Sequence, residues 1–181
     1  KVPEYDYPIP AQLYAPGYIY VDQGGKRFMN ETGVDPPMMW TQVWHWDVRT
    51  LSYPRVPSWQ IFDDDTFRAG QVASTVRGKI GDVYQWSSDN VAELERGWII
   101  KGDSVGELAQ KIGLYPPAFQ ETVARYNSSC AVGYDPDFNR SLQTLVALIR
   151  PPFYAMHIWP CALNTQGGPR RNAQARVLDT Y

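Results

Sequence analysis

The stretch LNTQGGPRRN, residues 163–172, combines residue types that could orient and polarise a small molecule. Two adjacent glycines, Gly167 and Gly168, remove every Cβ from a short piece of backbone, so another group can approach the main chain closely. Amide and hydroxyl side chains before them supply hydrogen-bond donors and acceptors. These side chains are Asn164, Thr165 and Gln166. Such a loop suits ligand binding, and a simple Gly-Gly turn between two strands is the alternative.

Glu31 is the carboxylate that we expect to take part in catalysis, because it follows a predicted hairpin strand and opens an irregular, aromatic-rich segment. The alternative is a solvated carboxylate at a strand end. His157 is predicted to be a structural strand residue, and His45 lies between two tryptophans of a possible aromatic groove. The aspartates at positions 63–65 precede a predicted helix, so they indicate helix capping rather than a metal cluster. We therefore expect no metal site.

Composition narrows the class of protein. The chain has 181 residues, 44% hydrophobic and 20% charged, with a formal net charge of −2. These values are typical of one soluble globular domain and do not distinguish the cytoplasm from the periplasm. The basic residues are scattered and the apolar runs are short, so we expect no nucleic-acid binding and no transmembrane segment. No G-x-G-x-x-G, P-loop, H-E-x-x-H or G-x-S-x-G motif occurs, which excludes a self-contained nucleotide or hydrolase site.

The elements that must position these residues alternate between strands and helices without a regular βαβ period. Strand patterns flank the glycine loop at residues 151–161 and 173–179, and a buried strand ends at the acidic residues, with Asp64 or Asp65 as the cap of the next helix. Other segments predict a hairpin around a Gly-Gly turn, two helices and a capped turn. The hairpin lies at residues 18–31, the two helices at residues 104–112 and 116–130, and the capped turn at residues 90–97. The sequence therefore predicts an α+β fold with a mixed sheet, hairpins and several helices.

Three ordered motifs carry a family resemblance. They are GYIYVDQGGKRFMNE, VPSWQIFDDDTFRAG and PPFYAMHIWPCALNTQGGPRRNAQARVLD. In this order they resemble the substrate-side or cap region of flavoproteins of the fumarate reductase and succinate dehydrogenase superfamily, which includes the 3-ketosteroid Δ1-dehydrogenases. The family's hairpin G-K-R-F-x-N-E is similar to residues 25–31, its T-x-G-G to residues 165–168 and its later strand to residues 175–179. The likeness covers nearly the whole chain.

The resemblance implies that residues 1–181 are a single cap domain, excised from a larger protein whose other domain binds most of the FAD. It implies an oxidoreductase that moves a hydride between flavin and a carbon next to a carbonyl or carboxylate. Gly167 and Gly168 would lie against the flavin, and Asn164, Thr165 and Gln166 would orient the substrate. The partners implied are a small-molecule substrate and the FAD domain of the same polypeptide. The fragment alone is expected to be inactive.

Two departures from the family affect the expected substrate. Soluble fumarate reductases carry T-R-D after the N-E, and a histidine directly before T-x-G-G that binds a substrate carboxylate. Here the chain has TGVD and Asn164, which argues against a C4-dicarboxylate. ALNTQGG is closer to the L-G-T-x-G-G of the ketosteroid dehydrogenases, so a larger apolar substrate is the alternative. Arg170 and Arg171 could replace the lost positive charge, by holding an oxygen or relaying a proton, or be solvated surface residues.

A non-catalytic binding module is the candidate from another class of protein. The chain contains seven tryptophans and twelve tyrosines, many of them in proline-rich stretches. Exposed indoles could stack on a sugar or an extended peptide. The tryptophans concerned are Trp40, Trp44 and Trp46.

Overall fold

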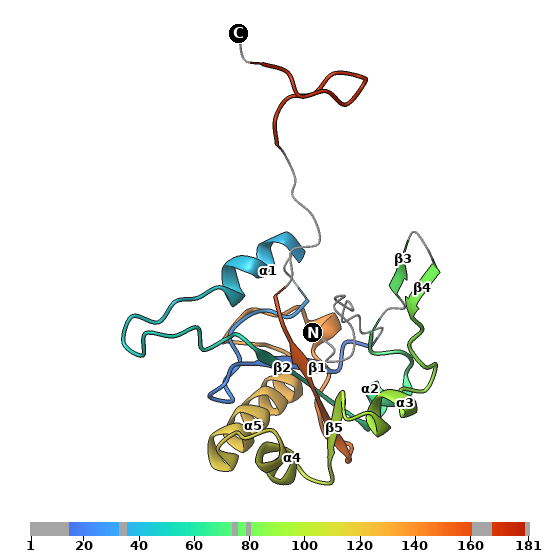
Figure 1. The fold of residues 1–181 in the computed structure, drawn as a ribbon. Helices are drawn as coiled ribbons and strands as arrows, with labels where there is room; N and C mark the ends of the chain where they lie inside the picture. Colours follow the sequence, from blue (N-terminus) through green and yellow to red (C-terminus); the bar gives the residue numbers. More distant parts are fainter. Residues whose placement is uncertain (1–14, 33–35, 74–75, 79–80, 161–167, 180–181) are drawn as a thin grey trace.

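The computed structural model describes residues 15–32, 36–73, 76–78, 81–160 and 168–179 of the chain. Over these residues it forms the helices and strands shown in Figure 1. Their bounds are β1 Tyr18–Val21, α1 Pro36–Val43, β2 Ser58–Asp63, α2 Asp64–Arg68, β3 Val76–Gly78, β4 Gly81–Tyr84, α3 Val91–Glu95, β5 Ile99–Gly102, α4 Val105–Lys111, α5 Pro116–Val132, a 3-10 turn Leu142–Thr144 and β6 Phe153–Ile158. The predicted α+β class is confirmed.

A four-stranded antiparallel sheet with the order β1-β2-β6-β5 forms the centre of the molecule. Strand β2 is buried along its whole length, as the sequence predicts for SWQIFD. It pairs with β1 on one side, where Tyr18 lies opposite Phe62, and with β6 on the other, where Trp59 lies opposite His157. The β3 and β4 strands form a separate two-stranded hairpin.

Helices α4 and α5 cover one face of the sheet (Figure 1). The main hydrophobic core lies between these two helices and the sheet. Alternate residues of β1 and β2 point into it, as the two-residue period of a strand requires. From the helices it receives Leu108, Phe119, Val123 and Tyr126, among others. The spacing of these apolar residues is helical, so the predicted helices at 104–112 and 116–130 are confirmed.

Two smaller clusters cover the opposite face. One surrounds Phe62 and Tyr154 and includes Phe67 of α2 and Trp86. The other contains Tyr20, Phe28, Met29 and Val43, so α1 contributes to it. Both faces of the sheet therefore carry packed side chains.

Among the described residues, none of the helices has the length and apolar character of a membrane span.

The predicted cap of α4 by Ser104 is confirmed, since the backbone N–H of Glu107 donates to Ser104 Oγ at 3.1 Å. The return bond of a capping box is displaced by one residue, because Glu107 Oε2 accepts from the N–H of Asp103 at 2.8 Å and not from that of Ser104. The other predicted caps were wrong in detail. Asp63, not Asp64 or Asp65, accepts from the N–H of Thr66 and caps α2.

Asn90 precedes α3 as predicted, but its side chain does not cap the helix. Its amide oxygen instead accepts from the indole of Trp86 and from the N–H of Val72, and its amide nitrogen donates to two carbonyls at the end of α2 and just after it. A fully buried amide must satisfy all its hydrogen-bonding groups, and here long-range partners do so.

Two predicted strands were wrong. The strand after the Gly-Gly turn is reduced to a single bridge between Val21 and Arg27, since the chain then turns to bury Phe28 and Met29. The strand at 173–179 is reduced to a bridge between Arg171 and Val177. A strand needs a neighbour along its length, and this segment pairs there only with its own preceding residues.

Candidate functional site

Strand β6 ends at Ile158, shortly before the glycine loop in the sequence (Figure 1). Four of the predicted ligand-binding residues, Asn164 to Gly167, lie outside the described residues. Gly168 is described, and its φ of +125° is a conformation that L side chains rarely adopt. A Cβ built on it would meet no atom within 4 Å. Its backbone is therefore open to approach by another group.

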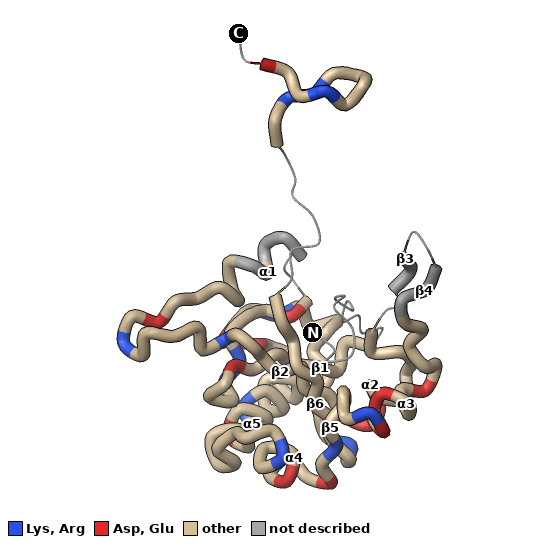
Figure 2. Tube along the Cα trace, in the orientation of Figure 1, with Lys and Arg blue, Asp and Glu red and all other residues tan. Residues whose placement is uncertain are grey.

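Arg170 and Arg171 are both exposed and lie on a short turn apart from the sheet (Figure 2). The N–H of Leu178 donates to the carbonyl of Arg170 at 2.8 Å, and the N–H of Asn172 donates to that of Arg176 at 3.1 Å. The Asn172 side chain closes the turn by accepting from two backbone N–H groups. These bonds fix the backbone, and within residues 168–179 and the other described ranges neither guanidinium group has a hydrogen-bond acceptor.

Glu31 lies in a buried ion network, which places it with charged residues that the sequence did not single out. Arg27 donates to both of its carboxylate oxygens at 2.8 Å, and Arg140 donates to Oε2 at 3.0 Å. Arg27 also donates to Asp135 at 3.0 and 3.2 Å. The side chains of Glu31, Asp135 and Arg140 have no exposed surface, and Arg27 has 5%.

The pKa values in this network follow from its pairing. Burial alone would lower the pKa of Arg27, but hydrogen bonds to Glu31 and Asp135 outweigh it and raise that pKa. Burial would raise the pKa of the Asp135 carboxyl, but the hydrogen bond and charge of Arg27 lower it. Both shifts favour the charged forms of Arg27 and Asp135 at neutral pH.

The structure does not bring Glu31 together with Arg170 and Arg171, since the network is buried and the C-terminal turn lies apart from it (Figure 1). Glu31 holds other segments in place: its backbone carbonyl accepts from the Tyr18 hydroxyl at 3.2 Å. This contact pattern is that of a structural group, and its catalytic role stays a prediction. The charged residues of the network stand in the segments GKRF and DPDFNR, but nothing in the sequence indicates that these two segments pair.

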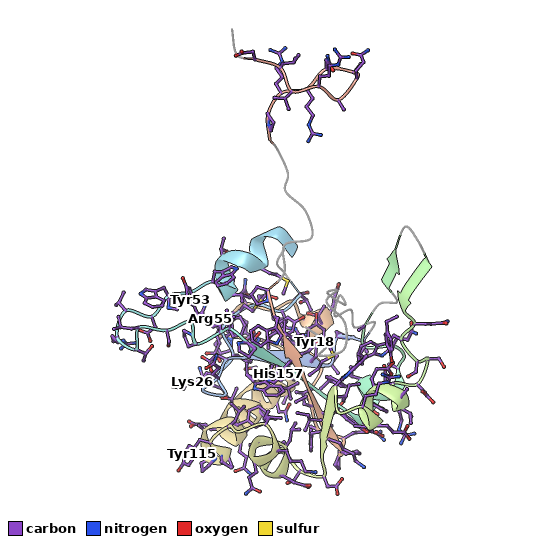
Figure 3. The ribbon with its side chains drawn as sticks, viewed as in Figure 1. Tyr18, Lys26, Tyr53, Arg55, Tyr115 and His157 are labelled. Carbon is purple, nitrogen blue, oxygen red and sulfur yellow. The ribbon has the colours of Figure 1, made fainter. Side chains whose placement is uncertain are left out.

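The two histidines have unlike surroundings. His157 stacks on Trp59, with 3.5 Å between ring centroids, and burial of its ring lowers its pKa. It lies on β6 over the sheet (Figure 3). This position fits the predicted structural role better than a catalytic one. His45 lies on an exposed loop.

FAD, which the family resemblance implies, does not fit these residues as a whole cofactor. Its pyrophosphate needs free N–H groups at a helix N-terminus or a glycine-rich turn. The two longest described helices, α1 and α5, each begin with two prolines, which carry no N–H. In α4 the N–H of Glu107 is already bonded to Ser104. The open backbone at Gly168 fits contact with a flat ring, so the described residues suit one end of the cofactor only.

Comparison with solved structures supports the fold. The structure resembles the 3-ketosteroid delta1-dehydrogenase from Sterolibacterium denitrificans, with a TM-score of 0.66 and 23% identity over 94% of this chain and 32% of that chain. It also resembles the solution structure of a fumarate reductase flavoprotein subunit from Lactobacillus plantarum, with a TM-score of 0.58 and 18% identity. That match covers 87% of this chain and 96% of the other.

Comparison of sequences identifies the family. The chain is 29% identical over 185 residues to the 3-oxosteroid 1-dehydrogenase of Mycolicibacterium smegmatis, a match over 91% of this chain and 30% of that protein. The chain thus spans about a third of this relative's length. Residues 8–180 match the family described as FAD binding domain, and this family and its flavoprotein relatives indicate FAD as the cofactor. The chain therefore belongs to the FAD binding domain family of flavoproteins.

Proposed function

We propose that this chain is the substrate-side cap of an FAD-dependent oxidoreductase that transfers a hydride between flavin and a carbon next to a carbonyl or carboxylate. The observation that carries the proposal is the family match over residues 8–180, in a chain without a phosphate-binding glycine motif. The chain also covers only 30% of its dehydrogenase relative. A fold neighbour of similar extent was solved as a separate chain, which supports an autonomous domain.

In this proposal the cofactor supplies the redox chemistry. The residues of this chain bind and orient the substrate and exclude water from the site. Gly167 and Gly168 let the backbone approach ring and substrate closely. The amide and hydroxyl groups of Asn164, Thr165 and Gln166 orient the substrate. Arg170 or Arg171 holds an oxygen of the substrate or relays a proton.

A large apolar ketone is the substrate class that we favour, with a 3-ketosteroid Δ1-dehydrogenase-like activity. Asn164 stands where soluble fumarate reductases have a carboxylate-binding histidine. Two of the similar proteins are named as steroid dehydrogenases, which supports the same class. A reductase acting on a small carboxylate is the second candidate, favoured by the fold neighbour named as a fumarate reductase subunit. The family match gives no support to a stand-alone aromatic binding module.

The full-length protein is expected to purify yellow and to release FAD on denaturation. An assay with an artificial electron acceptor should then show dehydrogenation of a 3-ketosteroid, and an assay with reduced viologen and fumarate should show little activity. A colourless, flavin-free protein would contradict the oxidoreductase proposal itself. A yellow protein that reduces fumarate and ignores the steroid would contradict only the substrate class.

Arg171→Ala in the full-length protein is expected to lower kcat by about tenfold or more, because a guanidinium that stabilises developing charge in a dry site contributes at least that much. Arg176→Ala is the matched control, since Arg176 is also exposed and lies on the same turn. Steady-state kinetics of both variants tests the assignment. Equal rates for Arg171→Ala and the unaltered protein would remove Arg171 from the site.

A further inference from the structure

The loop formed by residues 44–53, called here the tryptophan loop, projects from the body of the molecule next to α1 (Figure 1). Five of its ten residues are large apolar side chains with substantial exposed surface. They are Trp44, Trp46, Val48, Leu51 and Tyr53. Monomeric proteins rarely keep such a concentration of apolar surface without a binding role.

The loop is ordered by its own contacts. Asp47 and Ser52 exchange backbone hydrogen bonds, so the turn between them is closed. The Tyr53 ring lies edge-on to both indoles, with centroids 5.2 Å from Trp44 and 5.0 Å from Trp46. A preformed tip loses little conformational entropy when it binds.

Apolar and charged residues follow an order along the loop. Val48 and Leu51 lie within the turn and are 73% and 70% exposed, and the aromatic rings flank them. Arg55 lies nearer the sheet than Tyr53 (Figure 3), where its guanidinium stacks over Phe28 and donates to the carbonyl of Gln42. The tip carries aliphatic side chains, Trp and Tyr lie behind them, and Arg55 lies behind the aromatic rings. This order matches the polarity profile of a bilayer interface.

The charges of the loop suit an anionic surface. Asp47 is its only carboxylate, and this side chain is turned into the loop, where it accepts from the N–H of Arg49 at 2.8 Å. The Arg49 side chain is 89% exposed, and its guanidinium lies 3.7 Å from the Asp47 carboxylate, so these two charges offset each other. Arg55, two residues beyond the loop, leaves one guanidinium in excess over residues 44–55. Figure 2 shows that most of the loop carries no charge.

We propose that the tryptophan loop docks the protein onto an anionic lipid bilayer by inserting Val48 and Leu51 below the headgroups. A protein partner fits less well, because a stable protein interface uses about 20–30 residues on each side, and this tip offers ten. A bilayer needs only a few apolar side chains at its interface, together with a basic residue at the headgroups.

The test is flotation of the full-length protein with vesicles of phosphatidylcholine, with or without phosphatidylglycerol. The protein floats with the anionic vesicles, and Val48→Asp combined with Leu51→Asp lowers the bound fraction by about tenfold or more. Val132→Asp is the matched control, because Val132 is 79% exposed at the end of α5 and leaves binding unchanged. Melting temperatures of all variants check that the fold is retained.

Failure of the unaltered protein to float with either vesicle overturns the proposal. Binding that survives the double substitution overturns it as well, because another surface is then responsible. A loop-dependent dimer in solution without vesicle binding would assign the tip to a second copy of the protein instead. None of these outcomes depends on the flavin chemistry, since flotation needs no turnover.

Discussion

Gly168→Val in the full-length protein is expected to reduce turnover by about 100-fold, the loss that a displacement of about 1 Å at a reacting centre produces. In the proposed site, backbone at Gly168 approaches flavin and substrate, and a branched side chain would occupy that space. The described residues leave the position free, with no atom within 4 Å of a built Cβ. Steady-state kinetics measures the loss.

The same substitution should leave the melting temperature of the 181-residue chain nearly unchanged, because Gly168 lies on a segment apart from the hydrophobic core (Figure 1). Gly113→Val is the matched control. Gly113 also has a positive φ, +74°, and also meets no atom within 4 Å, but it follows the C-cap of α4 and joins the core residues Ile112 and Leu114. Its valine variant should melt earlier and keep its turnover. Unfolding of the chain by Gly168→Val would show that the glycine serves a turn geometry alone.

Local chemistry made several elements predictable from the sequence. The cap of α4 by Ser104 and the helical spacing of Phe119, Val123 and Tyr126 depend only on neighbours within the same helix. The buried strand SWQIFD was predictable because its Trp, Ile and Phe favour a strand and supply apolar side chains to both faces of the sheet. For these elements, local preference and tertiary packing agree.

The buried ion network was not predictable, because it joins residues 108 and 109 positions apart. No periodicity or motif in the sequence relates Arg27 to Asp135 or Glu31 to Arg140. The same reason explains Asn90, whose position suggested a helix cap but whose partners lie up to 23 residues away. Buried polar groups take whatever partners the tertiary fold offers, so their roles cannot be inferred from position alone.

The candidate site was predicted from a resemblance, and the residues of its loop lie mainly outside those that the structure describes. What the fold adds is the placement of Gly168 and the exposure of both arginines after β6. The lost strand at 173–179 fits this view, since the segment has no sheet edge beside it (Figure 1). In the proposed full-length protein, the FAD domain would supply that edge.

Arg140→Ala is expected to lower the free energy of unfolding by about 3–5 kcal/mol, which is the usual effect of breaking a buried ion pair. The Arg140 side chain has no exposed surface and donates to Glu31, to the carbonyl of Tyr18 at 2.7 Å and to that of Pro16. Its loss removes one of the two arginines that neutralise the buried Glu31 and takes a donor away from the Tyr18 and Pro16 carbonyls. Because small domains are stable by only about 5–15 kcal/mol, urea unfolding should detect the change easily.

Arg125→Ala separates the effect of burial from that of losing any arginine. Arg125 also binds a carboxylate through two hydrogen bonds, to Asp137, but its side chain is 62% exposed. Water can replace those bonds, so this variant should unfold at nearly the urea concentration of the unaltered chain. Similar losses for the two variants would contradict the structural role of the network. Glu31 would then need another explanation for its burial, and its predicted part in catalysis would be the first to test, by the kinetics of Glu31→Gln.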